Sequence, residues 1–255
     1  MQELQKYHQL TLRFETYNSG WLDSISGEIF VEREYEHPGV KILPGDVVLD
    51  LGGNIGIFAS YALGMGASRV YTVEPYPSYL ELLAKNMWQF GELVQILPYC
   101  VTNENKMGHL HVNFEQNTIY DEVFKERKWS MENSPQPPVP VECIRLDSLL
   151  KRHKIERVDF LKMDIEGSEY FLFRDIEPKL LQEKISRIVI EYHWSYNSEH
   201  LEIIQKLQDC GYAVTDLPVF EKAKVGKIFA SNPRLPLNAK ILADLEAQKL
   251  RVLQK

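Results

Sequence analysis

Apolar and polar positions along the chain repeat in the order strand, turn, helix and strand. The run from Val47 to Leu51 is apolar apart from Asp50, and a glycine turn follows it. Beyond this turn, apolar residues recur with helical spacing at Ile57, Phe58 and Tyr61, which predicts a helix. Arg69 to Val73 predicts a second strand. This order is typical of an α/β domain built on a parallel sheet.

The same alternation continues towards the carboxyl end. Strands are predicted at 93–98, 109–114, 139–144, 157–164 and 188–193, and a closing antiparallel pair at 212–217 and 225–230. Helices are predicted from Tyr79 to Met87, behind two prolines, and from Leu201 to Leu207, before Gly211. The pattern therefore predicts a Rossmann-like, doubly wound fold with right-handed crossovers.

The pattern divides the chain into a core domain at residues 41–236 and two flanking segments. Residues 1–40 hold two strand-like runs, Leu10 to Phe14 and Glu28 to Glu32, which predict a small β-rich cap. Residues 115–138 form a polar, proline-containing connection whose length suggests either a lid over a substrate pocket or a surface insertion. Residues 237–255 predict a tail helix that docks on the domain or contacts a second copy in a homo-oligomer.

The glycine turn identifies a ligand site. Gly52, Gly53 and Gly56 allow close backbone approach, but Asn54 stands where a dinucleotide fingerprint requires its second glycine. Asp50 would repel a pyrophosphate and suits a ligand with a cationic end, such as S-adenosylmethionine. Glu74 ends the second strand about 20 residues later, where such folds place a ribose-binding carboxylate. These features favour a methyltransferase over an NAD-dependent oxidoreductase.

Composition and charge narrow the class of protein. The 255 residues carry a formal net charge of −7, which gives no electrostatic case for a nucleic-acid surface. Cys100, Cys143 and Cys210 are far apart in apolar segments, which predicts reduced thiols in a cytoplasmic protein rather than disulfides or a zinc site. No apolar run is long enough for a membrane span, and the N-terminal segment lacks the apolar core of a signal peptide.

Three stretches of the chain form a recognisable set: the glycine turn from Asp50 to Gly56, the strand ending at Glu74, and the run Asp159-Phe160-Leu161-Lys162-Met163-Asp164-Ile165-Glu166-Gly167-Ser168-Glu169. Together they resemble the FkbM-type S-adenosylmethionine-dependent methyltransferases. The resemblance covers about residues 40 to 215 and leaves the N-terminal cap and the central connection unmatched. It implies a class I methyltransferase fold with a seven-stranded, mostly parallel sheet and one antiparallel strand. It also implies methyl transfer, usually to a hydroxyl oxygen of a sugar, a natural product or a glycan.

Methyl transfer to a hydroxyl requires a group that removes the proton, or a metal that lowers the hydroxyl pKa. The reactive crevice of an open α/β sheet lies beyond the carboxyl ends of its strands, where Asp164, Glu166, Glu191 and His193 fall. His193 is the preferred base because its unperturbed pKa lies near neutrality; the alternative is a structural, hydrogen-bonded histidine. Glu166 can instead cap the following helix, and Glu169 is interpreted as structural.

Asp164 has three open interpretations: it orients His193, contacts the methionine end of the cofactor, or holds the acceptor. The four side chains also permit a divalent metal, although their spacing does not prescribe one and a metal is not favoured. Tyr99 lies where the adenine ring is expected and either stacks on it or belongs to the core. A non-catalytic scaffold that kept the fold remains an alternative to the enzyme. The sequence predicts no nucleic-acid partner and leaves the acceptor open.

Overall fold

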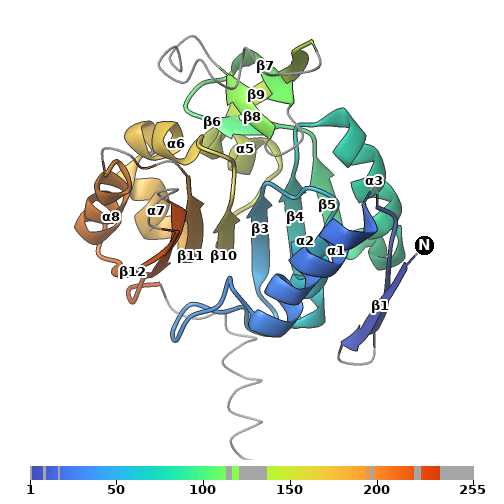
Figure 1. Cartoon of the computed structure of the whole chain (residues 1–255). Coiled ribbons are helices and arrows are strands. Elements are labelled where there is room, and N and C mark those ends of the chain that lie inside the picture. Colours follow the sequence, from blue (N-terminus) through green and yellow to red (C-terminus); the bar gives the residue numbers. More distant parts are fainter. Residues whose placement is uncertain are drawn as a thin grey trace, which may run out of the picture.

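The centre of the molecule is one seven-stranded sheet, as the computed structural model shows (Figure 1). The structure describes residues 2–7, 10–16, 18–112, 117–120, 137–193, 195, 198–220 and 225–235. The strand order is β12-β13-β11-β10-β3-β4-β5. The bounds are β3 Val47–Leu51, β4 Arg69–Val73, β5 Val94–Leu97, β10 Val158–Met163, β11 Ile185–Tyr192, β12 Ala213–Phe220 and β13 Val225–Ser231.

All the paired neighbours in this sheet are parallel except those of β13, which is antiparallel to both β11 and β12. The predicted seven-stranded, mostly parallel Rossmann-like sheet is therefore confirmed. Parallel strands with crossover helices place all their carboxyl ends on one edge. The glycine turn after β3, Glu74 after β4, and the polar residues after β10 and β11 consequently share that edge.

Helices cover both faces of the sheet, and successive strand residues face opposite layers. Leu49 and Leu51 pack in the layer of α5 Leu146–Arg152, α6 Glu169–Asp175, α7 Pro178–Lys184 and α8 His200–Asp209. Val48, between them, packs in the layer of α2 Ile57–Gly64 and α3 Pro77–Met87, which the 3₁₀ turn η2 Trp88–Leu93 extends. This period of two explains why the β3 sequence is apolar at nearly every position.

The N-terminal segment corrects one prediction. Leu10–Phe14 is strand β2, paired with β1 Gln2–Tyr7, as expected for a β-rich cap. The predicted strand at Glu28 to Glu32 is wrong, because these residues form the π-helical turn η1 Gly27–Glu32 directly after α1 Ser19–Ser26. The buried positions Leu22, Ser26 and Ile29 have helical spacing. This spacing indicates a helix, whereas the alternation of apolar and polar residues from Glu28 to Glu32 is too short to define a strand.

A second, four-stranded sheet lies at one end of the main sheet, at the top of Figure 1. Its order is β6-β9-β7-β8, with β6 Cys100–Thr102, β7 Lys106–Val112, β8 Asn117–Tyr120 and β9 Val139–Arg145. The strands predicted at 109–114 and 139–144 are thus β7 and β9. Most of the predicted lid at 115–138 and all of the predicted tail helix at 237–255 lie outside the described residues.

In the described part of the chain, no helix combines the length and the apolar character that crossing a membrane requires.

One buried ion pair fixes the loop that leads into β3. The Arg187 guanidinium lies 2.7 Å from the Asp46 carboxylate, and both side chains are almost completely buried. Burial raises the pKa of Asp46, whereas Arg187 lowers it. The pair joins the start of β3 to β11, so it helps to set the register of strands that carry the polar residues at the opposite edge.

We predict that Arg187→Met lowers the free energy of unfolding by about 3–5 kcal/mol, because it leaves the Asp46 carboxylate buried without a counter-charge. Urea unfolding followed by circular dichroism measures the change. The control is Lys179→Met, which removes an exposed pair with Glu183 and should change the free energy by less than about 0.5 kcal/mol. Equal effects in the two variants would contradict the prediction.

Candidate active site

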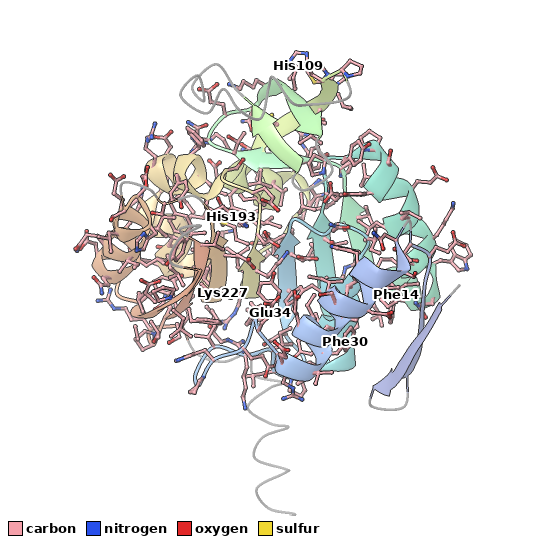
Figure 2. All side chains as sticks on the ribbon, viewed as in Figure 1. Phe14, Phe30, Glu34, His109, His193 and Lys227 are labelled. Carbon is pink, nitrogen blue, oxygen red and sulfur yellow. The ribbon has the colours of Figure 1, made fainter. Side chains whose placement is uncertain are left out.

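A cavity of about 770 Å³ lies at the carboxyl edge of the main sheet. Its walls include the glycine turn, Glu74, Asp164 and His193, together with Tyr35 from the N-terminal segment. Figure 2 shows Glu34 and Lys227 next to each other near the middle of the molecule, although they come from opposite ends of the chain. The expected crevice is therefore present, and the N-terminal segment closes one side of it.

The glycine turn contributes Gly52, Gly53 and Asn54 to the cavity wall. A Cβ added to Gly52, which has φ +84°, would lie 1.8 Å from the carbonyl oxygen of Asp164. A Cβ added to Gly53 would lie 2.0 Å from the Thr72 hydroxyl oxygen. The sequence indicates glycines for the approach of a ligand; the structure shows that they are also required for the turn to pack against β10 and β4.

Asp50 and Gly56 lie before and after the residues of the glycine turn that line the cavity. The Asp50 carboxylate is completely buried, accepts a hydrogen bond of 3.0 Å from Thr72 and lies 3.5 Å from the ammonium of Lys162. Burial raises the pKa of Asp50, while Lys162 lowers it. Gly56, at φ +93°, begins helix α2. Neither residue is among those that line the cavity, and contact of Asp50 with the cationic end of a ligand stays a prediction.

Glu74 lies on the cavity wall at the end of β4. Its carboxylate accepts hydrogen bonds from the backbone N–H groups of Asn54, at 3.0 Å, and Tyr76, at 2.8 Å. Burial raises the pKa of Glu74 to about 7, although these two bonds oppose the shift. Each carboxylate oxygen keeps a free lone pair, so the group can still accept from the two hydroxyls of a ribose.

The structure also tests whether S-adenosylmethionine fits here. The turn presents backbone groups to the cavity, Glu74 stands in the ribose position, and the buried Oδ1 of Asn54 has no hydrogen-bond partner among the described residues. Tyr99 lines the same cavity, half-buried, with the Arg152 guanidinium over its ring. The chemistry of these residues is compatible with the ribose and adenine of the cofactor, and their individual roles stay predictions.

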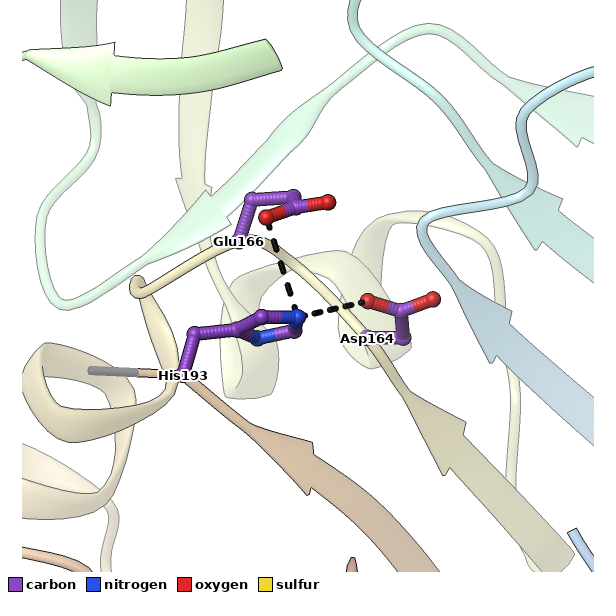
Figure 3. Close-up of side chains that lie close together, drawn as sticks. All are labelled: Asp164, Glu166 and His193. Carbon is purple, nitrogen blue, oxygen red and sulfur yellow. Dashed lines mark ion pairs between the residues drawn. The ribbon is translucent and has the colours of Figure 1, made fainter. Parts of the chain in front are cut away.

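A cluster of charged side chains occupies the ends of β10 and β11 (Figure 3). His193 Nε2 lies 3.7 Å from Asp164 Oδ1, 3.7 Å from Glu166 Oε2 and 4.0 Å from Glu191 Oε1. The sequence predicts this convergence, and the structure brings all four residues together. Glu166 adopts φ +53° in the loop before α6, an uncommon conformation for a non-glycine residue. It lines the cavity instead of capping the helix.

Glu169, which the sequence analysis interpreted only as structural, contacts the imidazole of His193. It is fully buried, and its Oε1 lies 3.2 Å from His193 Nδ1. Oε1 also accepts from the backbone N–H of Ile165 at 3.2 Å. Because Glu169 is an acceptor, Nδ1 of His193 carries a proton, and Nε2 is the nitrogen that faces the other carboxylates.

The pKa of His193 differs from the sequence expectation. Burial alone lowers it, but the hydrogen bond to Glu169 and the carboxylates of Glu166 and Asp164 raise it to about 10. Burial raises the pKa of Glu166 to about 8, with His193 opposing the shift. The surroundings of His193 therefore favour the protonated imidazole more than an unperturbed histidine would.

Burial also raises the pKa of Asp164, but Lys162 and His193 bring it below the ordinary value. In Glu191, burial and the neighbouring Asp164 raise the pKa. The ligand atoms of Asp164, Glu166 and His193 lie within 4.8 Å of one another, so this group can hold a divalent cation in place of the His193 proton. Glu169 would then orient the imidazole, as carboxylates commonly do for metal-bound histidines.

Three further residues that the sequence did not assign enter the site. Lys162 lies two positions before Asp164 on the same strand, and its ammonium contacts Asp50, Asp164 and the carbonyl oxygen of Gly52. Residues two positions apart on a strand point to the same face, so the sequence could have placed Lys162 beside Asp164. Tyr35 and Lys227 lie far from every motif, and no local pattern marks them.

Comparison with known proteins identifies the family of this chain. The profile of the methyltransferase FkbM domain matches residues 50–214. The 31-O-demethyl-FK506 methyltransferase FkbM of Streptomyces tacrolimicus is 40% identical over 240 residues, which cover 84% of this chain and 91% of that protein. Methyltransferase sdnD of Sordaria araneosa is 23% identical over 215 residues, covering 74% and 81% of the two chains.

The crystal structure of a methyltransferase FkbM from Methylobacillus flagellatus KT superposes with a TM-score of 0.53 at 14% identity, covering 80% of this chain and 47% of that one. This likeness shows the fold. Fold and site together define an S-adenosylmethionine-dependent methyltransferase. The chain belongs to the FkbM methyltransferase family, and the alternatives of an oxidoreductase and of a non-catalytic scaffold are set aside.

We predict that Glu74→Gln weakens S-adenosylmethionine binding by at least about tenfold, because charge-assisted hydrogen bonds are worth about 1.5–3 kcal/mol each. The wild-type affinity should also fall about tenfold from pH 8 to pH 6, since a group with a pKa near 7 becomes protonated over that range. Isothermal titration calorimetry at both pH values measures this. The control Glu81→Gln changes an exposed glutamate of α3 and should leave affinity unchanged. A Glu74→Gln protein that keeps the full pH dependence would contradict the assignment.

Proposed function

We propose that this enzyme methylates a hydroxyl oxygen of a small molecule, sugar, glycan or natural product. The observation that carries the proposal is His193, which Glu169 holds so that Nε2 faces the cavity. A histidine oriented through Nδ1 by a buried carboxylate is the arrangement used to deprotonate hydroxyl groups. The relative from Streptomyces tacrolimicus supports it, because its name specifies a methyl group carried by oxygen.

S-adenosylmethionine, when bound, supplies a methyl group on a sulfonium, which is a good leaving group. Glu74 and the Gly52–Asn54 turn would hold it, and the chain's remaining task is to align the acceptor oxygen and remove its proton. Alignment alone can supply several kcal/mol of the barrier. Water is kept from the inner part by Tyr35, Leu51 and Phe58, which line the cavity and are almost completely buried.

His193 acts as the base once the proton on Nε2 has been lost. The surrounding carboxyl groups favour this proton, but a cation that enters the cavity lowers the pKa of the imidazole by electrostatic repulsion. The ring thereby becomes a proton acceptor when the cavity is loaded. Asp164 and Glu191, on either side, then stabilise the imidazolium that forms as the acceptor loses its proton.

A divalent metal at Asp164, Glu166 and His193 is the second candidate for activating the hydroxyl. In that case the metal lowers the hydroxyl pKa directly, and His193 serves as a ligand. A chelator separates the two routes, because only the metal route loses activity when the protein is treated with EDTA and regains it when Mg²⁺ or Mn²⁺ is added.

The three cysteines are buried thiols, which supports the further proposal that the enzyme works in a reducing compartment such as the cytoplasm. A small-molecule or glycan acceptor, rather than a nucleic acid, is likewise supported by the net charge of −7.

The proposal is tested by incubating the enzyme with S-adenosylmethionine and a panel of hydroxylated compounds that includes 31-O-demethyl-FK506. Mass spectrometry detects a product that is heavier by one CH₂ group, and fragmentation or NMR locates the new methyl group. A methyl group on oxygen supports the proposal. A panel in which methylation occurs only on nitrogen or carbon would refute it.

We predict that His193→Gln lowers turnover by about 10²–10⁴-fold, the usual contribution of general-base catalysis. Cofactor affinity, measured by calorimetry, should stay within about threefold. The control is His109→Gln, a substitution at an exposed position of β7 that does not line the cavity, which should retain full turnover. A loss of less than tenfold in a folded His193→Gln protein would show that alignment, not proton removal by His193, limits the reaction.

A further inference from the structure

The Tyr35 hydroxyl lies between the two carboxylates that flank His193. It is 3.0 Å from Glu191 Oε2 and 3.3 Å from Asp164 Oδ2, and the tyrosine is almost completely buried. Burial and the two carboxylates raise the pKa of Tyr35 well above its ordinary value. The hydroxyl therefore stays protonated and donates a hydrogen bond to one carboxylate at a time.

The two oxygens of each carboxylate have different tasks. Asp164 contacts Tyr35 through Oδ2 and faces His193 through Oδ1, at 3.7 Å. Glu191 contacts Tyr35 through Oε2 and faces His193 through Oε1, at 4.0 Å. The tyrosine thus holds one oxygen of each group and leaves the other directed at the imidazole. If either carboxylate rotated, both contacts would change together.

Two lysines complete this side of the cluster. The Lys162 ammonium is 3.4 Å from Asp164 Oδ2, and the Lys227 ammonium is 3.6 Å from Glu191 Oε2 and 2.8 Å from Glu34. Both ammonium groups also lie over the Tyr35 ring, at 5.5 and 5.4 Å from its centroid. The ring therefore contacts both cations while its hydroxyl contacts both anions, which fixes the tyrosine strongly in one orientation.

Three of these residues lie outside the part of the chain that defines the family. Glu34 and Tyr35 precede, and Lys227 follows, the matched region at residues 50–214. Figure 2 shows Glu34 and Lys227 close to each other, and their charged groups are 2.8 Å apart. The charged cluster is thus completed by an N-terminal segment and by β13, the one antiparallel strand of the main sheet.

We propose that Tyr35 is a positioning residue that sets the orientation of Asp164 and Glu191 towards His193, with Lys227 as its partner. The inference rests on the proposed function in one respect, namely that the cluster around His193 activates the acceptor hydroxyl. Tyr35 neither removes a proton nor binds the cofactor in this assignment. Its effect is on the geometry of the two carboxylates, and a misplacement of about 1 Å at such a site costs about 10²-fold in rate.

The test compares Tyr35→Phe with Tyr61→Phe. Both tyrosines are buried, both hydroxyls donate to a glutamate or aspartate, and Phe keeps the ring contacts of each, including that of Tyr35 with Phe58. Tyr61 donates to Glu36 and lies outside the cavity, so it controls for the general loss of a buried hydroxyl.

With the acceptor that gives the most product in the panel described above, Tyr35→Phe should lower kcat by 10- to 100-fold. The KM for the acceptor and the calorimetric Kd for S-adenosylmethionine should both stay within about threefold. Tyr61→Phe should retain kcat. Lys227→Arg should keep most of the activity that Lys227→Met loses. A wild-type kcat in Tyr35→Phe, or an equal loss in Tyr61→Phe, would overturn the proposal.

A crystal structure of cofactor-free Tyr35→Phe gives a second readout that requires no acceptor. Asp164 and Glu191 should turn so that at least one of them loses its present approach to His193 Nε2. Both carboxylates remaining in place would overturn the positioning role. If the panel shows no methylation of oxygen, the proposed function fails while this structural readout still decides the role of Tyr35.

Discussion

The buried ammonium of Lys162 is the interaction on which the rest of the site depends. It lies among Asp50, Asp164 and the carbonyl oxygen of Gly52, and almost none of its surface is exposed. Burial lowers the pKa of Lys162, but Asp164 and Asp50 raise it above the ordinary value, so the lysine stays charged. One cation thus holds together β3, the glycine turn and β10. Without it, the buried carboxylate of Asp50 would have no counter-charge, at a cost of several kcal/mol, and Asp164 would lose its nearest cation.

Most of the fold and the centre of the site could be predicted because both follow from local patterns. Strand ends are visible in the sequence, and parallel strands bring their carboxyl ends to one edge. Asp164, Glu166, Glu191 and His193 therefore had to lie near one another once the sheet was predicted. Glu74 could be placed for the same reason, because its distance from the glycine turn is set by one helix and one strand.

The remaining features depend on contacts between distant segments, which a single sequence does not show. Tyr35 and Lys227 are separated by most of the chain and meet only because β13 inserts next to β11. The error at Glu28 to Glu32 has a different cause, since a run of five residues is too short for alternation to outweigh the helical spacing of the buried positions around it. The pKa of His193 could not be predicted either, because it reflects how many carboxylates surround the ring.

The carboxyl groups in the cavity make it a suitable place for a cation. Asp164, Glu166 and Glu191 surround one nitrogen of His193, and a proton on that nitrogen offsets part of the repulsion among those carboxyl groups that are ionised. A cation that enters the cavity stabilises the same carboxylates and therefore competes with this proton. Binding of a positively charged ligand and loss of the proton from His193 are thus coupled, and each of them favours the other. In the proposed mechanism, a cation that enters the cavity would lower the pKa of His193 by electrostatic repulsion, so that the binding step itself would make the imidazole available as the base.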